Sequence, residues 1–194
     1  MGMKITGLQE VQRALKKEID KLRTPHYALV GIHQSAGVEP DSDGMTVATL
    51  GAIQHFGADI NHPGGTRYQT TPGGKARFVS NDFVGPVSGV TQPHTIKIPA
   101  RRWLDVGAEA GTKEYLETIQ EGIEDGLDSK QIMARVGVEA VGAIQNYMED
   151  LDSPANAAST IRKKGSSNPL VDSGNLVQSV TSTVVAKKSK EGME

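Results

Sequence analysis

Residues Asp128–Leu151, DSKQIMARVGVEAVGAIQNYMEDL, carry the best helical period of the chain. Apolar side chains recur there three or four positions apart, so that a helix would gather them on one face. Asp128 and Gln131 have the spacing of a capping box, which marks the start of a helix. The sequence therefore predicts a long amphipathic helix that begins after Asp128. Its apolar positions are Ile132, Val136, Ala140, Ala143, Ile144, Tyr147 and Leu151.

Upstream of this helix, a strand is predicted at Thr95–Ile98, followed by a helix from Arg101 to about Gly126. Glycine lowers helix propensity, so Gly111 and Gly122 predict a kink or a break in that second element. Its apolar face is formed by Leu116, Ile119 and Ile123.

The N-terminal part of the chain alternates helix, strand and helix. Thr6 and Gln9 have capping-box spacing before a helix that Pro25 ends, and we expect this helix to pack on a sheet. A strand at His26–His33 follows. The apolar stripe of the first helix is Leu8, Val11, Leu15, Ile19 and Leu22, and a second helix carries Val47, Leu50 and Ile53 and ends at Gly57.

The segment Gly57–Pro93 loses the helical period and is rich in glycine and proline. Connections of this length are uncommon in a compact domain unless they serve a function. A turn at Pro72-Gly73-Gly74 separates two short β-rich runs, which predicts a β-hairpin. We interpret the segment as a projecting arm, with Tyr68, Phe78 and Phe83 available for docking; the alternative is a disordered surface loop.

Turn signals divide the C-terminal part. Ser153-Pro154 has the pattern of an N-cap and first helical residue, and the short helix it predicts ends at Gly165. Asp172 or Ser173 is predicted to cap one more turn. A strand at Val180–Val185 closes the fold, and residues 187–194 form a charged tail that we expect to be mobile.

These elements predict an α+β fold: a small, mainly antiparallel β-sheet packed with several helices, plus a long Gly/Pro-rich arm. The 194 residues suit a single domain over positions 1–186, with the arm at 57–93 inserted into it. Aromatic residues make up only 4% of the chain, which predicts a thin core of Val, Ile, Leu and Ala.

Composition narrows the function classes. A net charge of −2 argues against a protein whose main task is to grip nucleic acid. The absence of cysteine removes disulfides, thiolate nucleophiles and Cys-ligated zinc. No apolar run is long enough to span a bilayer and the N-terminus lacks a signal-peptide core, so the expected location is the cytoplasm of the producing cell.

Chemical motifs are weak. His55, Asp59 and His62 are possible zinc ligands, but no regular element fixes their mutual geometry. Neither glycine pair has the Lys-Ser/Thr of a phosphate loop, and no nucleophile elbow surrounds Ser173. We therefore predict no catalytic residue, no metal site and no cofactor, and keep a metal-dependent hydrolase as the enzymatic alternative.

Two basic groups leave alternatives open. Arg101 and Arg102 beside the only tryptophan, Trp103, could hold phosphates or bases, form a protein–protein hot spot, or flank a core anchor with the arginines at the surface. Basic residues of the predicted hairpin are either solvated or form a docking strip. They are Arg67, Lys75 and Arg77.

Several runs, taken in order, resemble the tail-completion (neck, or virion-morphogenesis) proteins of tailed bacteriophages. Ile98-Pro99-Ala100-Arg101-Arg102-Trp103-Leu104 resembles that family's "IPARPFL" run, and Pro169-Leu170-Val171-Asp172-Ser173-Gly174 resembles its "PLVDTG" run. Further similar runs are Leu50–Ala58, which matches a helix ending in "(H/N)EFG", Ile60–Thr66, and Thr160–Gly165, which matches "T-I-x-x-K-G".

The chain departs from that pattern at His55, where glutamate is common, at Arg102, where proline is usual, and at Ser173, where threonine is usual. Each motif is a turn or strand junction, so the order and spacing of the motifs carry the resemblance. The motif positions expected to be structural are Pro99, Pro169, Asp172, Ser173, Gly174 and Leu176.

The resemblance implies a non-enzymatic virion protein at the head–tail junction or upper tail, assembled in the host cytoplasm. Such a subunit would form a ring with copies of itself and contact the head–tail connector, the tail terminator and the tail tube, with DNA passing through the lumen but no sequence-specific reading of it. Another virion ring protein, a tail terminator or head-closure subunit, is the nearest alternative. The expected contact residues are Arg67, Tyr68, Lys75, Arg77, Phe78, Arg101, Arg102 and Trp103.

Overall fold

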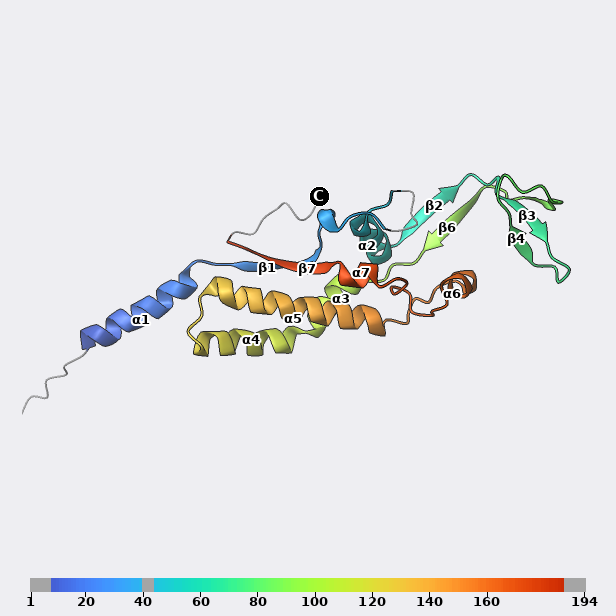
Figure 1. The fold of residues 1–194 in the computed structure, drawn as a ribbon. Helices are drawn as coiled ribbons and strands as arrows, with labels where there is room; N and C mark the ends of the chain where they lie inside the picture. Colours follow the sequence, from blue (N-terminus) through green and yellow to red (C-terminus); the bar gives the residue numbers. More distant parts are fainter. Residues whose placement is uncertain (1–7, 40–43, 187–194) are drawn as a thin grey trace, which may run out of the picture.

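The computed structural model describes residues 8–39 and 44–186 as an elongated α+β fold (Figure 1). This part of the chain holds seven α-helices and small antiparallel sheets of two, two and three strands. The helices are α1 (Leu8–Arg23), α2 (Val47–Phe56), α3 (Trp103–Ala110), α4 (Thr112–Glu124), α5 (Ser129–Asp150), α6 (Ala158–Lys164) and α7 (Asn175–Gln178). The strands are β1 (Tyr27–Ile32), β2 (Ala58–His62), β3 (Arg67–Thr70), β4 (Ala76–Phe78), β5 (Gly89–Val90), β6 (His94–Ile98) and β7 (Val180–Val185).

Helix α5 is the central element of the helical body. Its predicted capping box is confirmed: the amide of Gln131 donates to Oδ1 of Asp128 over 2.8 Å, and the amide of Asp128 donates to Oε1 of Gln131 over 3.1 Å. The helix packs on α3 and α4 and on both strands of the β1–β7 ladder. The buried core around it consists of Val47, Trp103, Ile144, Met148, Leu170, Leu176, Val177 and Val180.

The predicted first and last strands pair with each other. The β1–β7 ladder is antiparallel and runs from Tyr27 opposite Val185 to Ile32 opposite Val180. Helix α5 approaches this ladder closely at Gly137, where an added Cβ would lie 2.8 Å from Oγ of Ser182. Glycine therefore allows the close approach of helix and sheet, because a larger residue would displace the Ser182 side chain.

The predicted helix from Arg101 to Gly126 is two helices, α3 and α4, with the break at Gly111. The predicted interruption is thus confirmed at one of its two glycines, because α4 continues through Gly122. Gly107 of α3 lets the helix come close to α5, since an added Cβ would lie 3.0 Å from Cα of Ile144.

Two helix starts in the C-terminal part differ from prediction. Helix α6 begins at Ala158 and not at Ser153-Pro154, because residues 152–157 form a loop in which the carbonyl of Pro154 accepts Nε of Arg101. The predicted stop at Gly165, in left-handed conformation, is confirmed. Helix α7 has Gly174 as its N-cap, and the hydroxyl of Ser173 accepts the amide of Asn175 over 3.2 Å.

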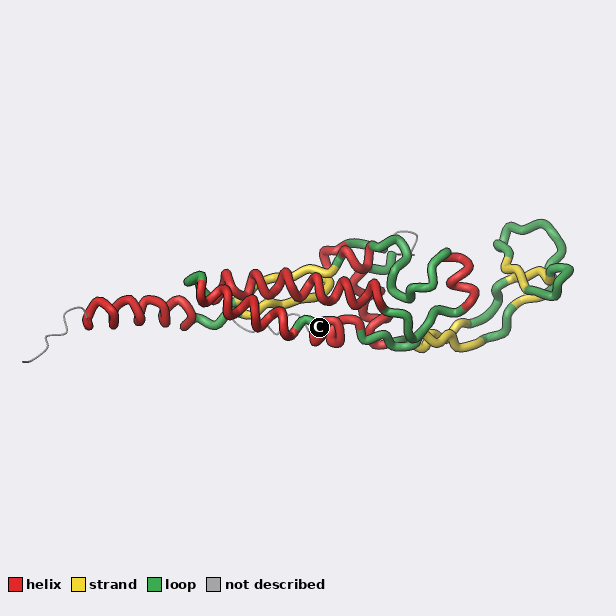
Figure 2. Tube along the Cα trace, turned by 90° about the horizontal axis from the view of Figure 1, so that it is seen from below, coloured by secondary structure: helices red, strands yellow, loops and turns green. Residues whose placement is uncertain are grey.

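Helix α1 does not pack on a sheet, which corrects the prediction. It extends from one end of the helical body, and both views show it leaving that body (Figures 1 and 2). The sheet that it was expected to cover already carries α5. The predicted cap at Thr6 and the charged tail 187–194 lie outside the described residues.

The strands do not form one sheet. The predicted strand at Thr95–Ile98 is part of β6, which pairs with β2 and not with the β1–β7 ladder. A third sheet, in the order β4-β3-β5, lies beyond that pair. Together these strands form the arm, at the end of the molecule opposite α1 (Figure 1). No helix in the described ranges is long and apolar enough to cross a membrane.

Candidate interaction site: the arm and its base

The stem of the arm is the antiparallel pair of β2 and β6. Its register runs from Ala58 opposite Ile98 to His62 opposite His94. Ile60 and Ile96 face each other at the middle of the pair, and both remain about two-fifths exposed, at 44% and 41%. The stem thus carries an apolar pair that its own chain covers only in part.

The tip of the arm contains the predicted hairpin, which is confirmed. The amide of Thr71 donates to the carbonyl of Lys75 over 2.9 Å, and the amide of Gly74 donates to the carbonyl of Thr71 over 2.8 Å. Strand β3 pairs with β4 on one side and with β5 on the other. The tip is therefore an ordered three-stranded sheet and not a structureless loop (Figure 2).

The tip side chains predicted as contact residues fall into two groups. Arg67 and Tyr68 are half-buried: Nη1 of Arg67 donates to the carbonyl of Asn81 over 2.6 Å, and the Tyr68 ring lies against Gly89. Lys75, Arg77 and Phe78 are exposed, and Phe78 stands opposite Tyr68 across the β3–β4 pair.

The arm has no core of its own. Every residue from 58 to 98 is half-buried or exposed. The β-pairing is therefore held mainly by backbone hydrogen bonds, and short ladders of this kind are marginal in water without an apolar face to cover. Such an element gains stability when another surface covers it.

Both ends of the arm meet at Gly57, next to the body. An added Cβ at Gly57 would lie 2.8 Å from the backbone nitrogen of Ala100 and 2.8 Å from the carbonyl oxygen of Ile98. Gly57 also has φ of +76°, a conformation that favours glycine, and its amide donates to the carbonyl of Ile53 to end α2. The outgoing and returning chains are thus in contact where the arm leaves the body.

Arg101 joins the base of the arm to two other segments. Its backbone amide donates to the carbonyl of Gln54 over 2.8 Å, and Nη1 donates to Oε1 of Gln54 over 2.6 Å. Nε donates to the carbonyl of Pro154 over 2.9 Å and Nη2 to Oδ1 of Asn156 over 3.1 Å. All of these acceptors are neutral amide oxygens.

The arginine is 3% exposed, so the expectation that it lies at the surface is wrong. Burial lowers the pKa of the Arg101 guanidinium, because desolvation disfavours its charged form. The guanidinium presents its donors in a fixed planar fork, which suits acceptors on two different segments.

Trp103 is buried in the core, which agrees with the predicted alternative of a core anchor. Its indole nitrogen donates to the carbonyl of Gly51 over 3.0 Å, and its ring makes an edge contact with His55 at a centroid distance of 5.8 Å. His55 is itself buried, with Nε2 3.9 Å from Oδ1 of Asp105. The burial of Arg101 and Trp103 leaves Arg102 as the exposed member of this group.

Arg102 pairs with Asp105 one turn further along α3. Nε of Arg102 donates to Oδ2 of Asp105 over 2.8 Å, and Nη2 also contacts that oxygen. The hydrogen bond with Arg102 lowers the pKa of Asp105, and the amide of Val106 donating to the same carboxylate acts in the same direction. In turn, Asp105 raises the pKa of Arg102.

The Pro169–Gly174 run lies at the end of α5 and not in the arm. Asn168, just before it, accepts the amides of Leu170 and Val171 at Oδ1 over 2.8 and 2.9 Å. Its Nδ2 donates to the carbonyls of Met148 and Glu149, near the end of α5. Of the motif positions expected to be structural, Pro169 and Leu176 are buried. Asp172 and Ser173 are exposed, and so is Pro99, which lies at the end of the arm. This run is therefore held against the end of α5, just before α7.

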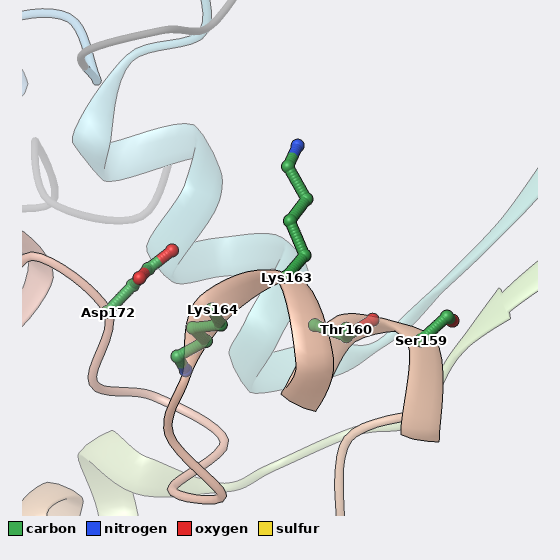
Figure 3. A pocket seen from close by; sticks show the side chains of 5 residues that line it. All are labelled: Ser159, Thr160, Lys163, Lys164 and Asp172. Carbon is green, nitrogen blue, oxygen red and sulfur yellow. The ribbon is translucent and has the colours of Figure 1, made fainter. Parts of the chain in front are cut away.

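A surface hollow of about 480 Å³ lies beside this run (Figure 3). It is lined by four residues of α6 and by Asp172, which comes from the neighbouring loop. Lys164 is part of the wall and donates to the carbonyl of Asn168 over 2.6 Å. Burial lowers the pKa of Lys164, and Asp172 opposes that shift. The hollow is open and the structure shows no group in it that points to a particular ligand.

The histidines considered as metal ligands are not brought together. His62 stacks on His94 across the stem at a centroid distance of 5.0 Å, while His55 packs on Trp103 at the other end of β2. Within residues 8–39 and 44–186, no group of three or more His, Asp or Glu side chains could hold a metal ion.

Sequence reasoning missed the polar residues that hold distant segments together. Gln54 and Asn156 bind Arg101 at the base of the arm, and Asn168 binds the end of α5, yet nothing in their local pattern marks them. The only signal available was indirect: Gln54 and Arg101 both lie inside runs that resemble the phage family.

Comparisons with protein families, with characterised proteins and with solved structures give no match for this chain.

Proposed function

We propose that this protein is a structural virion subunit at the head–tail junction of a tailed bacteriophage, of the tail-completion or neck type. The order and spacing of the runs that resemble that family remain the basis for naming the class. The observation that best supports an assembly role is the arm: an ordered extension with no buried residue, held at a fixed base by Gly57 and Arg101.

The arm suits an assembly part because its free surface needs a partner. Its tip exposes the apolar side chains of Phe78 and Val84 and also the cations of Lys75 and Arg77. Aromatic and arginine side chains are enriched at protein interfaces. A heterologous contact made by such an arm, repeated from one subunit to the next, closes into a ring when the rotation allows it.

In this role the protein acts on no substrate and uses no cofactor. Its partners are copies of itself, the head–tail connector, the tail terminator and the tail tube, and its final location is the virion, after assembly in the host cytoplasm. DNA passes through the ring lumen without being read. A tail-terminator or head-closure subunit would use the same physics of ring closure and stays the second candidate.

The test is electron microscopy of lysates from a phage that carries a stop codon early in this gene. DNA-filled heads lying beside separate, full-length tails are the expected result. The matched control is the same phage grown in a host that suppresses the stop codon, which should restore joined particles. Normal infectious particles without suppression would overturn the proposal.

A further inference from the structure

Helix α1 presents an apolar stripe that nothing in the described chain covers. Val11, Leu15 and Ile19 are 64%, 59% and 56% exposed, and Leu22 is 40% exposed. These four side chains fall three or four positions apart and so lie on one face of the helix. Single exposed apolar residues need no explanation, but a continuous stripe marks an interaction surface.

The connection to the body keeps α1 away from the rest of its own chain. The hydroxyl of Ser129 donates to the carbonyl of Thr24 over 2.5 Å and lies 2.6 Å from Nδ1 of His26. Nζ of Lys21 donates to the carbonyl of Gly126 over 2.8 Å. The C-terminal end of α1 is therefore fixed beside the α4–α5 turn, and the helix extends beyond it (Figure 1).

A second exposed apolar stripe lies on α4. Leu116 and Ile123 are 64% and 50% exposed, and Ile119 is half-buried between them. They have the same three-and-four spacing as the stripe of α1. The inner side of α4, which includes the buried Gly122, packs on α5, so this stripe remains on the outer side.

The two helices have opposite net charge. Helix α1 has five basic and three acidic residues, a net charge of +2. Helix α4 has one basic and four acidic residues, a net charge of −3. Two copies of α1 brought together would repel each other, whereas α1 and α4 attract.

We propose that α1 of one copy docks along the exposed Leu116–Ile123 stripe of α4 in a second copy. The contact is heterologous, since a different surface is used on each partner, and it repeats from copy to copy. The inference goes beyond the proposed function and does not depend on it, because it rests only on the exposure, spacing and charge of two helices.

One helix–helix stripe is smaller than a standard interface, which has about 20–30 residues a side. The isolated contact is therefore weak, and cross-linking is the suitable test. The natural chain contains no cysteine, so single cysteines report one contact at a time. The test pair is Leu15→Cys in one protein and Leu116→Cys in a second, distinguishable by mass, mixed at equal concentration and oxidised.

Matched controls use the opposite faces of the same helices. Lys17 lies two positions from Leu15, which places it about 200° around the helix. Lys17→Cys mixed with Leu116→Cys, and Leu15→Cys mixed with Glu121→Cys, therefore have similar exposure but no predicted contact. Adding Glu117→Lys and Glu124→Lys to the Leu116→Cys protein tests the charge component.

The expected result is a heterodimer that forms severalfold faster in the test pair than in either control, and more slowly after charge reversal or in high salt. Three outcomes overturn the proposal. If the test and control pairs cross-link at equal rates, the cross-links come from random collision. If Leu15→Cys alone forms homodimers as fast as the test pair forms heterodimers, α1 pairs with α1. If a chain that carries both Leu15→Cys and Leu116→Cys forms the disulfide within one monomer, α1 folds back on its own α4.

Because purified protein is used, this result stands apart from the virion role. If the cross-link fails to form, the docking of α1 on α4 is refuted but the stop-codon test of the virion role still stands. If the stop-codon phage is normal, the virion role is refuted but the cross-linking result still stands.

Discussion

Arg101 shows how a single residue can determine the direction of a large element. Its guanidinium joins α2, the returning strand of the arm and the loop after α5. Burial in this position costs free energy unless every donor finds an acceptor, and a charged group that loses its partners costs most. The residue is therefore better understood as the connection that fixes the arm than as a surface contact.

Replacing Arg101 by lysine is expected to lower the free energy of unfolding by about 2–4 kcal/mol, because one ammonium group cannot reach the separate acceptors on α2 and on the loop after α5. Urea denaturation of the purified protein measures this change. The control is Arg102→Lys, whose side chain is exposed, so that the stability should stay close to that of the natural chain. Equal effects of the two substitutions would contradict the assigned role of Arg101.

Asp105 gives a prediction for acid conditions. Its pKa in the folded protein lies below the ordinary value of 3.8, because Arg102 and the amide of Val106 stabilise the carboxylate. A group with a lowered folded pKa adds stability above its unfolded pKa and loses it as the pH falls through the folded value. Asp105→Asn should therefore reduce stability at neutral pH, with a difference from the natural chain that shrinks below about pH 4. Urea midpoints measured from pH 3 to pH 7 test this, and a difference that grows in acid would contradict it.

At the scale of elements, the arm and α1 share one property: each extends from the body without covering its own apolar surface. The arm contains no buried residue, and the stripe of α1 is exposed from Val11 to Leu22. Their stability therefore differs in origin from that of α5, whose apolar face is part of the core.

Deleting Arg67–Val79 is expected to leave a folded protein that fails to join heads to tails. The deletion removes β3 and β4 but leaves the β2–β6 stem and the contacts of Arg101. Because no buried residue is lost, the free energy of unfolding should change by less than about 1 kcal/mol.

Urea denaturation and complementation of the stop-codon phage measure the two effects of this deletion separately. If the chain that lacks Arg67–Val79 still supports full assembly, the role of the tip is refuted. If that chain fails to fold, the tip is not independent of the body.

At the scale of the whole molecule, the chain is elongated, with α1 and the arm at opposite ends of a helical body (Figures 1 and 2). A compact protein of 194 residues has a radius of gyration of about 16 Å. Small-angle X-ray scattering of the monomer should give a clearly larger value. Removing the tip 67–79 should lower it, whereas Arg102→Lys should leave it unchanged. A compact value for the full chain would contradict the extended arrangement.

Most helix and strand boundaries could be predicted from the sequence, because their signals are local. The capping box at Asp128, the Gly111 break, the Pro72–Gly74 turn and the Gly57 helix end each depend on a few neighbouring residues. The prediction of a helix start at Ser153-Pro154 was wrong, because a Ser-Pro pair is also a common turn pattern and residues 152–157 form a loop.

Which apolar and charged surfaces are covered could not be predicted, because it depends on tertiary contacts. The stripe of α1 and the apolar face of α5 have the same spacing, yet one is exposed and the other is core. Likewise, Arg101 and Arg102 are adjacent, yet one is buried and the other exposed. Periodicity states that a face is apolar but not what lies against it, since that depends on contacts between residues far apart in the chain.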